Sequence, residues 1–171
     1  LAGMVCELEG DFAGAAQELQ RAIEYAVIAE DHDRLARLNR HMSIIYGKQG
    51  AFDDSISYAE KALNYYETIG DRLNIESVRN NLTATYVYSG QYEEAIDVGT
   101  AALGFFQTIE SPSLIASTAT NVAEAHLALG NVVQAHHYAQ LSLHEEDPHV
   151  TPYALHLLGE IATTEEQTET A

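Results

Sequence analysis

The stretch GQYEEAIDVGTAAL, residues 90–103, decides the fold, because its pattern returns every 40 residues along the chain. In each copy of the pattern a glycine is followed by an apolar residue two positions later and by a small residue five positions later. These glycines are Gly10, Gly50, Gly90 and Gly130. Four copies in register, with no gap between them, indicate a repeat protein in which each copy is one structural unit.

Each copy is expected to form two helices. Apolar side chains recur at helical spacing over residues 38–46, and again over residues 52–66 after an interruption at Gly50. Glycine adopts the positive φ that ends a helix at little cost, so Gly50 and Gly70 are predicted helix ends. Asp71 is then well placed to cap the next helix. No stretch alternates with period two, so no half-buried strand is expected.

Small and aromatic residues recur at the positions expected to pack in the core. Ala62 and Ala102 occupy equivalent places in successive copies, where a small side chain lets neighbouring helices approach closely. Aromatic pairs stand at residues 65–66 and 105–106, again 40 residues apart. We expect both alanines to be buried, together with one member of each aromatic pair.

The order of residues in this repeat resembles the tetratricopeptide repeat. Tyr92, Ala95 and Ala102 match the aromatic and alanine positions of its second helix. Leu82 and Tyr86 match the Leu and Tyr positions of its first helix. The period is longer than the usual length of about 34 residues, and the family's Trp is absent. This longer form is similar to repeats of bacterial signal-transduction and transcription-activator proteins and of kinesin light chain-like scaffolds.

The resemblance implies an all-α fold, a right-handed α-solenoid of antiparallel helix pairs. It covers residues 1–163, which would hold about four helix-pair units and a closing helix at 153–161. Residues 164–171 are expected to be a polar, acidic tail. Because the chain begins with Leu, it is expected to be a piece of something longer.

Composition narrows the classes of partner and compartment. The chain has 8 Lys and Arg against 26 Asp and Glu, a formal charge of −18 that disfavours nucleic acid and an anionic membrane as partners. It contains no apolar run of about 20 residues, the length that spans a bilayer. Cys6 is the only cysteine, so no internal disulfide is expected and a cytoplasmic location is predicted.

No catalytic signature is present, so neither an enzyme nor a bound cofactor is expected. Phosphate loops, nucleophile elbows, His-Glu-x-x-His pairs and Cys-x-x-Cys pairs are all missing. Histidines gather near the end of the chain, at His136, His137, His144 and His149. No carboxylate or cysteine completes a recognisable ligand spacing with them. Solvent-facing histidines are therefore favoured over a metal site.

The resemblance implies a ligand-binding concave surface, lined by the first helix of each unit. In the second repeat these positions fall on Arg37, Arg40, His41, Ile44 and Lys48. In the third they fall on Ser77, Asn80, Asn81, Ala84 and Tyr88. In the fourth they fall on Ser117, Thr120, Asn121, Glu124 and Ala128, and the fifth helix continues with Tyr153, His156 and Glu160.

Two features of this predicted groove suggest what it binds. Asn81 and Asn121 recur at one groove position, and an amide that both donates and accepts can pair with the backbone of an extended peptide. Half of all basic residues, Arg34, Arg37, Arg40 and Lys48, lie within 15 positions of an acidic chain. Guanidinium groups suit an acidic partner, although pairing with Asp31 and Asp33 is an equally good interpretation.

Two hypotheses about function remain open at this stage. The first is a binding module that holds a protein or an extended, acidic peptide segment in its groove. The second is a regulatory domain of a larger bacterial signalling protein or transcription activator, in which the groove senses a small effector or a segment of the same protein. Whether the array forms a homo-dimer through its ends is also open.

Overall fold

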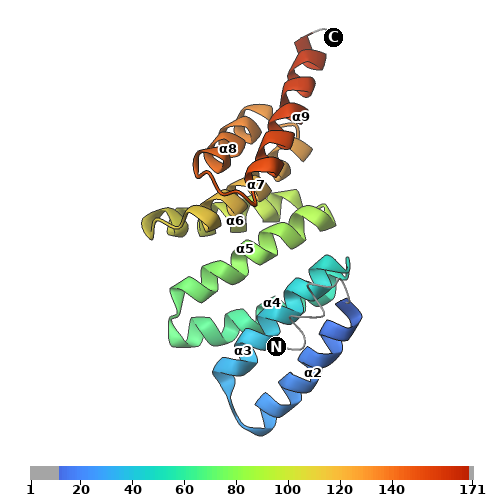
Figure 1. Cartoon of the computed structure of the whole chain (residues 1–171), viewed down its shortest axis with the longest axis vertical. Coiled ribbons are helices and arrows are strands. Elements are labelled where there is room, and N and C mark those ends of the chain that lie inside the picture. Colours follow the sequence, from blue (N-terminus) through green and yellow to red (C-terminus); the bar gives the residue numbers. More distant parts are fainter. Residues whose placement is uncertain (1–11, 170–171) are drawn as a thin grey trace. The chain divides into compact units, whose positions relative to one another are not determined.

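The structure is a computed structural model that describes residues 12–169, with side chains described as far as residue 164 (Figure 1). Within this range the chain forms eight helices and no strand. The helices are α2 (Phe12–Ile28), α3 (His32–Lys48), α4 (Phe52–Ile69), α5 (Arg72–Ser89), α6 (Tyr92–Thr108), α7 (Pro112–Ala128), α8 (Val132–His144) and α9 (Thr151–Glu169). Helix α2 is thus the second helix of the first copy, and α3, α5, α7 and α9 are first helices.

Residues with positive φ end the helices at the predicted places. Gly50, Gly90 and Gly130 have φ values of 75°, 77° and 75°, and Gly70 closes α4 in the left-handed conformation. Gly10, the first glycine of the pattern, lies outside the described residues. Glu30 and Glu110 stand 40 residues before and after Gly70 and also have positive φ, 53° and 52°. The turn geometry therefore repeats with the sequence even where the residue is not glycine.

Side-chain caps and a proline begin several of the first helices. The Asp71 carboxyl accepts hydrogen bonds from the backbone N–H of Asn74 at 3.1 Å and from its Nδ2 at 2.8 Å. These bonds stabilise the carboxylate and hold the pKa of Asp71 below its ordinary value. In the same way Asp31 accepts from the Arg34 backbone N–H at 3.0 Å. Pro112 occupies the first turn of α7, where its missing N–H costs no helical hydrogen bond.

The chain divides into two compact units, residues 1–85 and residues 86–171, with the boundary inside α5. In the first unit α3 packs against both α2 and α4. Its core includes Met42, Ile45, Ala59, Ala62 and Tyr66, each at most 1% exposed. Burial of Ala62, and of Tyr66 while Tyr65 stays partly exposed, confirms the expectation for this copy of the repeat.

A buried group of hydroxyl side chains joins three helices of the first unit. The Ser55 hydroxyl donates to the Ser43 carbonyl oxygen at 2.8 Å and lies 3.1 Å from the Thr85 hydroxyl. A Cβ added at Gly47 would lie 3.3 Å from both the Ser55 and the Thr85 hydroxyl oxygens. The absence of a side chain at Gly47 therefore leaves room for these hydroxyl groups.

In the second unit α7 packs against α6, α8 and α9. One core cluster gathers around Phe106 and contains Ala102, Leu103, Ile115 and Ala119. A second cluster joins α7, α8 and α9 and contains Ala123, Ala135, Ala139, Leu157 and Ile161. Ala102 and Phe106 are fully buried and Phe105 is only partly so, as predicted for the second copy.

The end of the second unit departs from the regular repeat. Helix α8 has 13 residues, against 17 in α6, and a turn-rich segment containing Pro148 separates it from α9. Helix α9 begins at Thr151 and continues to Glu169, past the expected closing helix at 153–161. None of the described helices is both long and apolar enough to cross a membrane.

Candidate functional site

Helices α7 and α9 each present one stripe of polar and aromatic side chains. Along α7 the stripe consists of Ser117, Thr120, Asn121 and Glu124, spaced i, i+3, i+4 and i+7. Along α9 the same spacing gives Tyr153, His156, Leu157 and Glu160. Residues with this spacing share one helix face. Since α7 and α9 pack together in the second unit, their two stripes can line a common surface.

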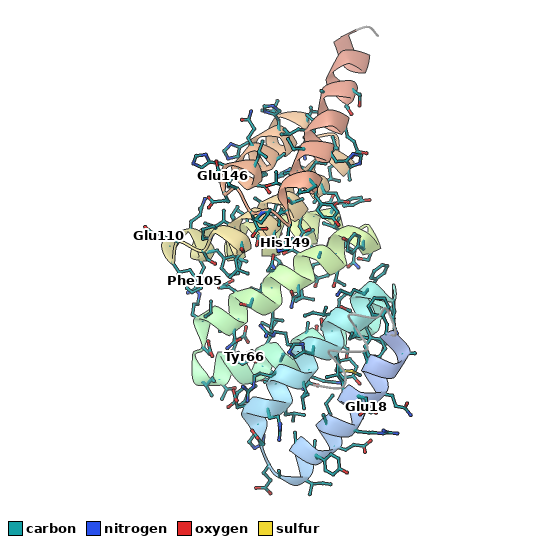
Figure 2. The ribbon with its side chains drawn as sticks, in the orientation of Figure 1. Glu18, Tyr66, Phe105, Glu110, Glu146 and His149 are labelled. Carbon is teal, nitrogen blue, oxygen red and sulfur yellow. The ribbon has the colours of Figure 1, made fainter. Side chains whose placement is uncertain are left out.

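The two stripes enclose a pocket of about 470 Å³ in the second unit. Helix α5 contributes Tyr88 to its wall, and the segment between α8 and α9 contributes His149 and Val150. His149 is labelled in Figure 2. The pocket therefore has walls from three helices and one connecting segment, all within residues 86–171.

Most groove positions predicted for the second unit line this pocket. They are Tyr88, Ser117, Thr120, Asn121, Glu124, Tyr153, His156 and Glu160. Ala128 does not belong to the lining. The sequence reasoning missed Leu157, which the i+4 spacing from Tyr153 would have found. It also missed His149 and Val150, because the connection before α9 does not follow the repeat and has no counterpart in earlier copies.

The carboxyl group of Glu124 in the pocket lining has a raised pKa. Burial raises its pKa, and the nearby negative charge of Glu160 raises it further. No other described residue forms a hydrogen bond or ion pair with Glu124. Glu160 lies 3.6 Å from His156, measured from Oε1 to Nε2. The pocket thus holds two carboxyl groups, and the charge of Glu160 is close enough to disfavour ionisation of Glu124.

The polar side chains of the α7 stripe differ in what they can offer a ligand. The Thr120 hydroxyl donates to the Ala116 carbonyl oxygen at 3.0 Å and lies 2.7 Å from the Ser142 hydroxyl. The Ser117 hydroxyl donates to the Leu114 carbonyl oxygen at 3.3 Å. The side-chain amide of Asn121 forms no hydrogen bond with any described residue. Asn121 therefore retains its full capacity to donate and accept.

In the first unit the two arginines at predicted groove positions differ in their ion pairing. The Arg37 guanidinium forms an ion pair with the Asp33 carboxylate at 2.8 Å, as the local-pairing interpretation expects. Arg40 is half-buried, and its Nε atom is buried without a hydrogen-bond partner. Burial raises the pKa of the nearby Tyr66 hydroxyl, and the positive charge of Arg40 opposes that shift. Tyr66 is labelled in Figure 2.

The other predicted positions of the first unit lie at or near its surface. The Lys48 ammonium is 5.9 Å from the ring centroid of Phe12, and the Ser77 hydroxyl donates to the Leu73 carbonyl oxygen at 2.7 Å. The remaining positions are half-buried: His41, Ile44, Asn80, Asn81 and Ala84. A pocket of about 440 Å³ between α2 and α3 contains none of the predicted groove residues.

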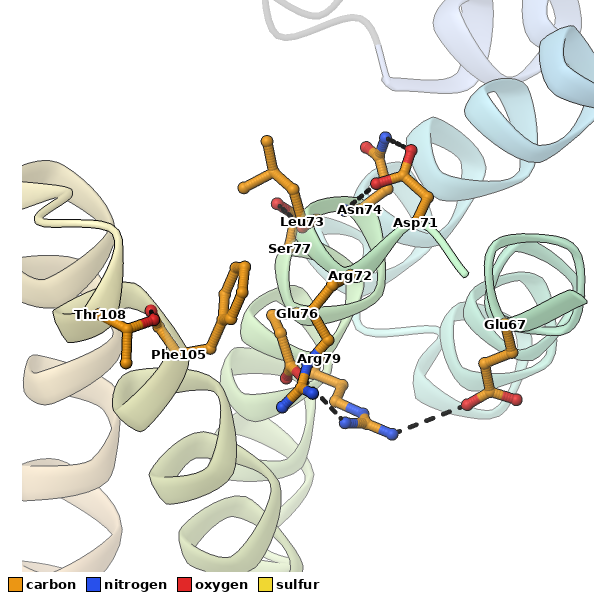
Figure 3. Close-up of polar contacts among 10 residues, drawn as sticks. All are labelled: Glu67, Asp71, Arg72, Leu73, Asn74, Glu76, Ser77, Arg79, Phe105 and Thr108. Carbon is orange, nitrogen blue, oxygen red and sulfur yellow. Dashed lines mark hydrogen bonds and ion pairs between the residues drawn. The ribbon is translucent and has the colours of Figure 1, made fainter. Parts of the chain in front are cut away.

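An ion-pair network on α5 was not foreseen from the sequence (Figure 3). The Glu76 side chain is fully buried, and its Oε1 accepts from Arg72 Nε at 2.8 Å and from Arg79 Nη1 at 3.1 Å. Arg79 also lies 3.6 Å from Glu67. A Glu flanked by Arg at helical spacing usually marks a solvated helix face, so only the structure shows that this carboxylate is buried.

The histidines near the end of the chain do not converge. His149 lines the pocket, whereas His136 lies 3.5 Å from Gln140 on α8. His126 stacks on Tyr138 at a centroid distance of 5.4 Å, and burial lowers its pKa. Over the described part of the chain, no group of three or more His, Cys, Asp or Glu side chains is placed to hold a metal ion.

Helix pairs repeating every 40 residues, with no strand between residues 12 and 169, define an all-α repeat protein of the solenoid class. A family model described as "Tetratricopeptide repeat" matches residues 34–108. The predicted resemblance is therefore confirmed over residues 34–108, and the groove positions carried over from it remain predictions.

Solved structures support the same fold. The structure of BtubC (BKLC) from P. vanneervenii has a TM-score of 0.81 and 20% identity, over 96% of this chain and 70% of that one. A kinesin light chain-like protein of Podosopora anserina with nearly identical TPR-like repeats has a TM-score of 0.78 and 16% identity, over 98% of this chain and 85% of that one. Its Q17M variant gives 0.72 and 16%, over 99% and 93%. The search of curated proteins found no match.

Proposed function

We propose that this protein is a non-catalytic scaffold that binds extended segments of partner proteins on the first helices of its repeats. A tetratricopeptide-repeat fold is consistent with a role in protein interaction. The observation that carries the proposal is the pocket of the second unit, in which groove positions from α5, α7 and α9 come together. A concave site with a few convergent polar groups is a typical ligand site.

Asn121 is the residue to which we assign the main-chain contact. Its amide lies in the pocket lining, is half-buried and forms no hydrogen bond within the described chain. An amide can donate to a peptide carbonyl and accept from a peptide N–H at the same time. This pairing would hold an extended peptide without regard to its sequence, and the neighbouring side chains would then select among peptides.

Peptides selected from a displayed library by the wild-type protein provide the test. Asn121→Ala should weaken their binding by about 0.5–1.5 kcal/mol, the value of one neutral hydrogen bond, and the loss should hardly change with salt. The matched control is Asn64→Ala, which removes an exposed amide from α4, outside the pocket. Equal losses in the two variants, or none in Asn121→Ala, would contradict the assignment.

The first unit offers a second contact, to an acidic group. Arg40 has no ion pair with any described residue, whereas Arg37 is paired with Asp33. We propose that Arg40 meets a carboxylate of the partner, a charge-assisted contact of about 1.5–3 kcal/mol if water is excluded. Arg40→Ala should weaken the binding of an acidic peptide, and part of this loss in affinity should disappear at high salt. Lys61→Ala, which removes a positive charge from α4, should not.

The effector-sensing alternative has one observation in its favour. The pocket volume of about 470 Å³ lies within the range of about 300–1,000 Å³ that small-molecule sites occupy. In that case single metabolites would raise the melting temperature of the wild-type protein, and Asn121→Ala would reduce the shift. The proposal has further parts. We propose a cytoplasmic location, which cell fractionation would test, and a homo-dimer, which sedimentation would test. We also propose that the protein makes no direct contact with nucleic acid or membrane.

A further inference from the structure

Fixed positive charge is confined to the first unit. All eight Lys and Arg residues lie between residues 21 and 79, whereas residues 86–171 contain twelve Asp and Glu and neither Lys nor Arg. The only side chains in the second unit that can become cationic near neutral pH are histidines. Any pocket in this unit therefore faces a ligand with negative or neutral groups at pH 7 and above.

Two carboxyl groups lie in the pocket walls without a fixed counter-ion. Glu124 stands on α7 and Glu160 on α9, and both are exposed to a ligand in the pocket. Glu124 has no partner among the described residues, and Glu160 has only His156. The raised pKa of Glu124 reflects partial burial and the charge of Glu160, so its ionised form lacks stabilisation. A cation placed between the two carboxylates would supply it.

The remaining walls suit the rest of a long basic side chain. Tyr88 and Tyr153 line the pocket and are 65% and 69% exposed, so their rings are available to a ligand. A cation within about 6 Å of a tyrosine ring face gains a favourable interaction. Val150 and Leu157 add aliphatic surface to the same lining. Lysine and arginine side chains bury their stems on such surface while the charged head stays near polar groups.

From this combination we infer that the pocket of the second unit receives a lysine or arginine side chain of the bound peptide. The inference rests on the proposed peptide-binding function and specifies the chemistry of that site. The ammonium or guanidinium group lies between Glu124 and Glu160, and the aliphatic stem lies against the tyrosines and Leu157. A carboxylate in this position would meet two like charges and no Lys or Arg.

Binding should strengthen as pH rises through the weakly acidic range. The groups that face the cation are Glu124, Glu160, His149, His156, Tyr88 and Tyr153. Ionisation of Glu124 adds attraction to the cation. Cation binding at a pH where Glu124 is partly protonated should therefore release protons.

The experiment compares peptides that differ only in charge. The probes are Ac-Ala-Ala-Arg-Ala-Ala-NH₂ and the same peptide with citrulline, which keeps the shape of arginine without the charge. The free small cation butylguanidinium shows whether the peptide backbone contributes. Binding is followed by calorimetry and by amide shifts of Asn121 and Leu157 in labelled protein. The variants are Glu124→Gln and Glu160→Gln, and Glu94→Gln is the control, an exposed acid of α6 outside the pocket.

We expect the arginine peptide to bind wild type at least fivefold more tightly than the citrulline peptide, and more tightly than butylguanidinium. Each pocket variant should lose most of this preference, and Glu94→Gln should stay within twofold of wild type. Circular dichroism would check that both pocket variants remain folded. Equal binding of arginine and citrulline peptides at Asn121 would overturn the charge preference and leave peptide binding intact. If neither peptide shifted these amides, both the charge preference and peptide binding would be overturned. If butylguanidinium bound as tightly as the arginine peptide, the pocket would be a site for a free small cation, and the peptide assignment would be overturned.

Discussion

Helices α3 and α7 are the first helices of the second and fourth repeats, one in each unit, yet their predicted groove positions differ in charge. On α3 these positions include Arg37, Arg40 and Lys48, whereas on α7 they include Asn121 and Glu124. The buried positions on the partner helices match, because Ala62 and Ala102 are both fully buried. The fold therefore depends on the buried face of each repeat, and the groove face can change charge without changing the fold.

The two units also differ in how they satisfy their charges. In the first unit Arg37, Arg72 and Arg79 are all engaged with carboxylates of the same unit. In the second unit no described carboxylate has a Lys or Arg to pair with, because the unit contains neither. Several charges of the first unit therefore form ion pairs within that unit. Charges in the second unit mainly remain available to solvent or a ligand.

The largest effect should come from breaking the buried ion pairs of the first unit. Removing one partner of a buried pair costs about 3–5 kcal/mol, because the other charge is left buried. Glu76 is fully buried and would keep only Arg72, whose side chain is 67% exposed. We expect Arg79→Ala to lower the free energy of unfolding by about 3 kcal/mol, measured by urea denaturation.

An exposed ion pair of the same unit is the control for this prediction. Arg21 pairs with Glu18 at 2.8 Å, with side chains 59% and 38% exposed. Exposed pairs contribute about 0.2–1 kcal/mol, so Arg21→Ala should have a small effect. An equally small effect of Arg79→Ala would show that the Glu76 carboxylate does not depend on Arg79. The two units would then differ less in how far ion pairs contribute to their stability.

Much of the fold follows from the sequence because it depends on residues that repeat. The 40-residue spacing of Gly50, Gly90 and Gly130 gave the helix ends, and the aromatic pairs gave the buried rings of Tyr66 and Phe106. Each of these positions is supported by an equivalent one elsewhere in the chain. Independent copies of a pattern reduce the chance that any single helix or core position is misassigned.

The candidate site was only partly predictable, for physical reasons that differ between residues. The α7 stripe could be placed because helical spacing alone brings Ser117 and Glu124 to one face. His149 enters the pocket from a connection that has no regular spacing. The burial of Glu76 depends on tertiary packing, which the spacing of Arg72 and Arg79 does not reveal. Irregular connections and buried charges therefore required the structure.

A second prediction tests whether equivalent buried positions are packed equally tightly in the two units. Ala62 and Ala102 are both fully buried, with 0% relative exposure. A leucine at either position adds three carbon atoms to a filled site, which typically costs about 1–3 kcal/mol. We expect Ala62→Leu and Ala102→Leu to lower the unfolding free energy by similar amounts within this range.

Thermal and urea unfolding of the two leucine variants would measure these losses, with Ala101→Leu as control because Ala101 is exposed on α6. The control should change stability by no more than about 0.5 kcal/mol. An unchanged melting temperature for Ala102→Leu would mean that the register of the repeat is wrong at that position. A loss in one unit alone would mean that equivalent positions are packed differently.

The smallest effect concerns two carboxyl groups, one in each unit, whose pKa values shift in opposite directions. Hydrogen bonds from Asn74 lower the pKa of Asp71, so Asp71 contributes stability above its unfolded pKa of about 3.9 that is lost as pH falls through the lower folded value. Burial and Glu160 raise the pKa of Glu124. Stability is therefore lost as pH rises from the unfolded value of about 4.3 through the higher folded value.

Carboxyl-to-amide variants isolate these two contributions, since Asn also caps helices well. At pH 7 Asp71→Asn should be less stable than wild type by under about 1 kcal/mol, and Glu124→Gln more stable by under about 0.5 kcal/mol, because both groups are partly solvated. The Glu124→Gln difference should shrink as pH falls to about 4, whereas the Asp71→Asn difference should shrink only below about 4. Urea midpoints at about pH 7, 5.5, 4 and 3 would measure them. A Glu124→Gln variant less stable than wild type at pH 7 would show that Glu124 is stabilised when ionised, and the pocket would then already contain the positive charge that we assign to its ligand.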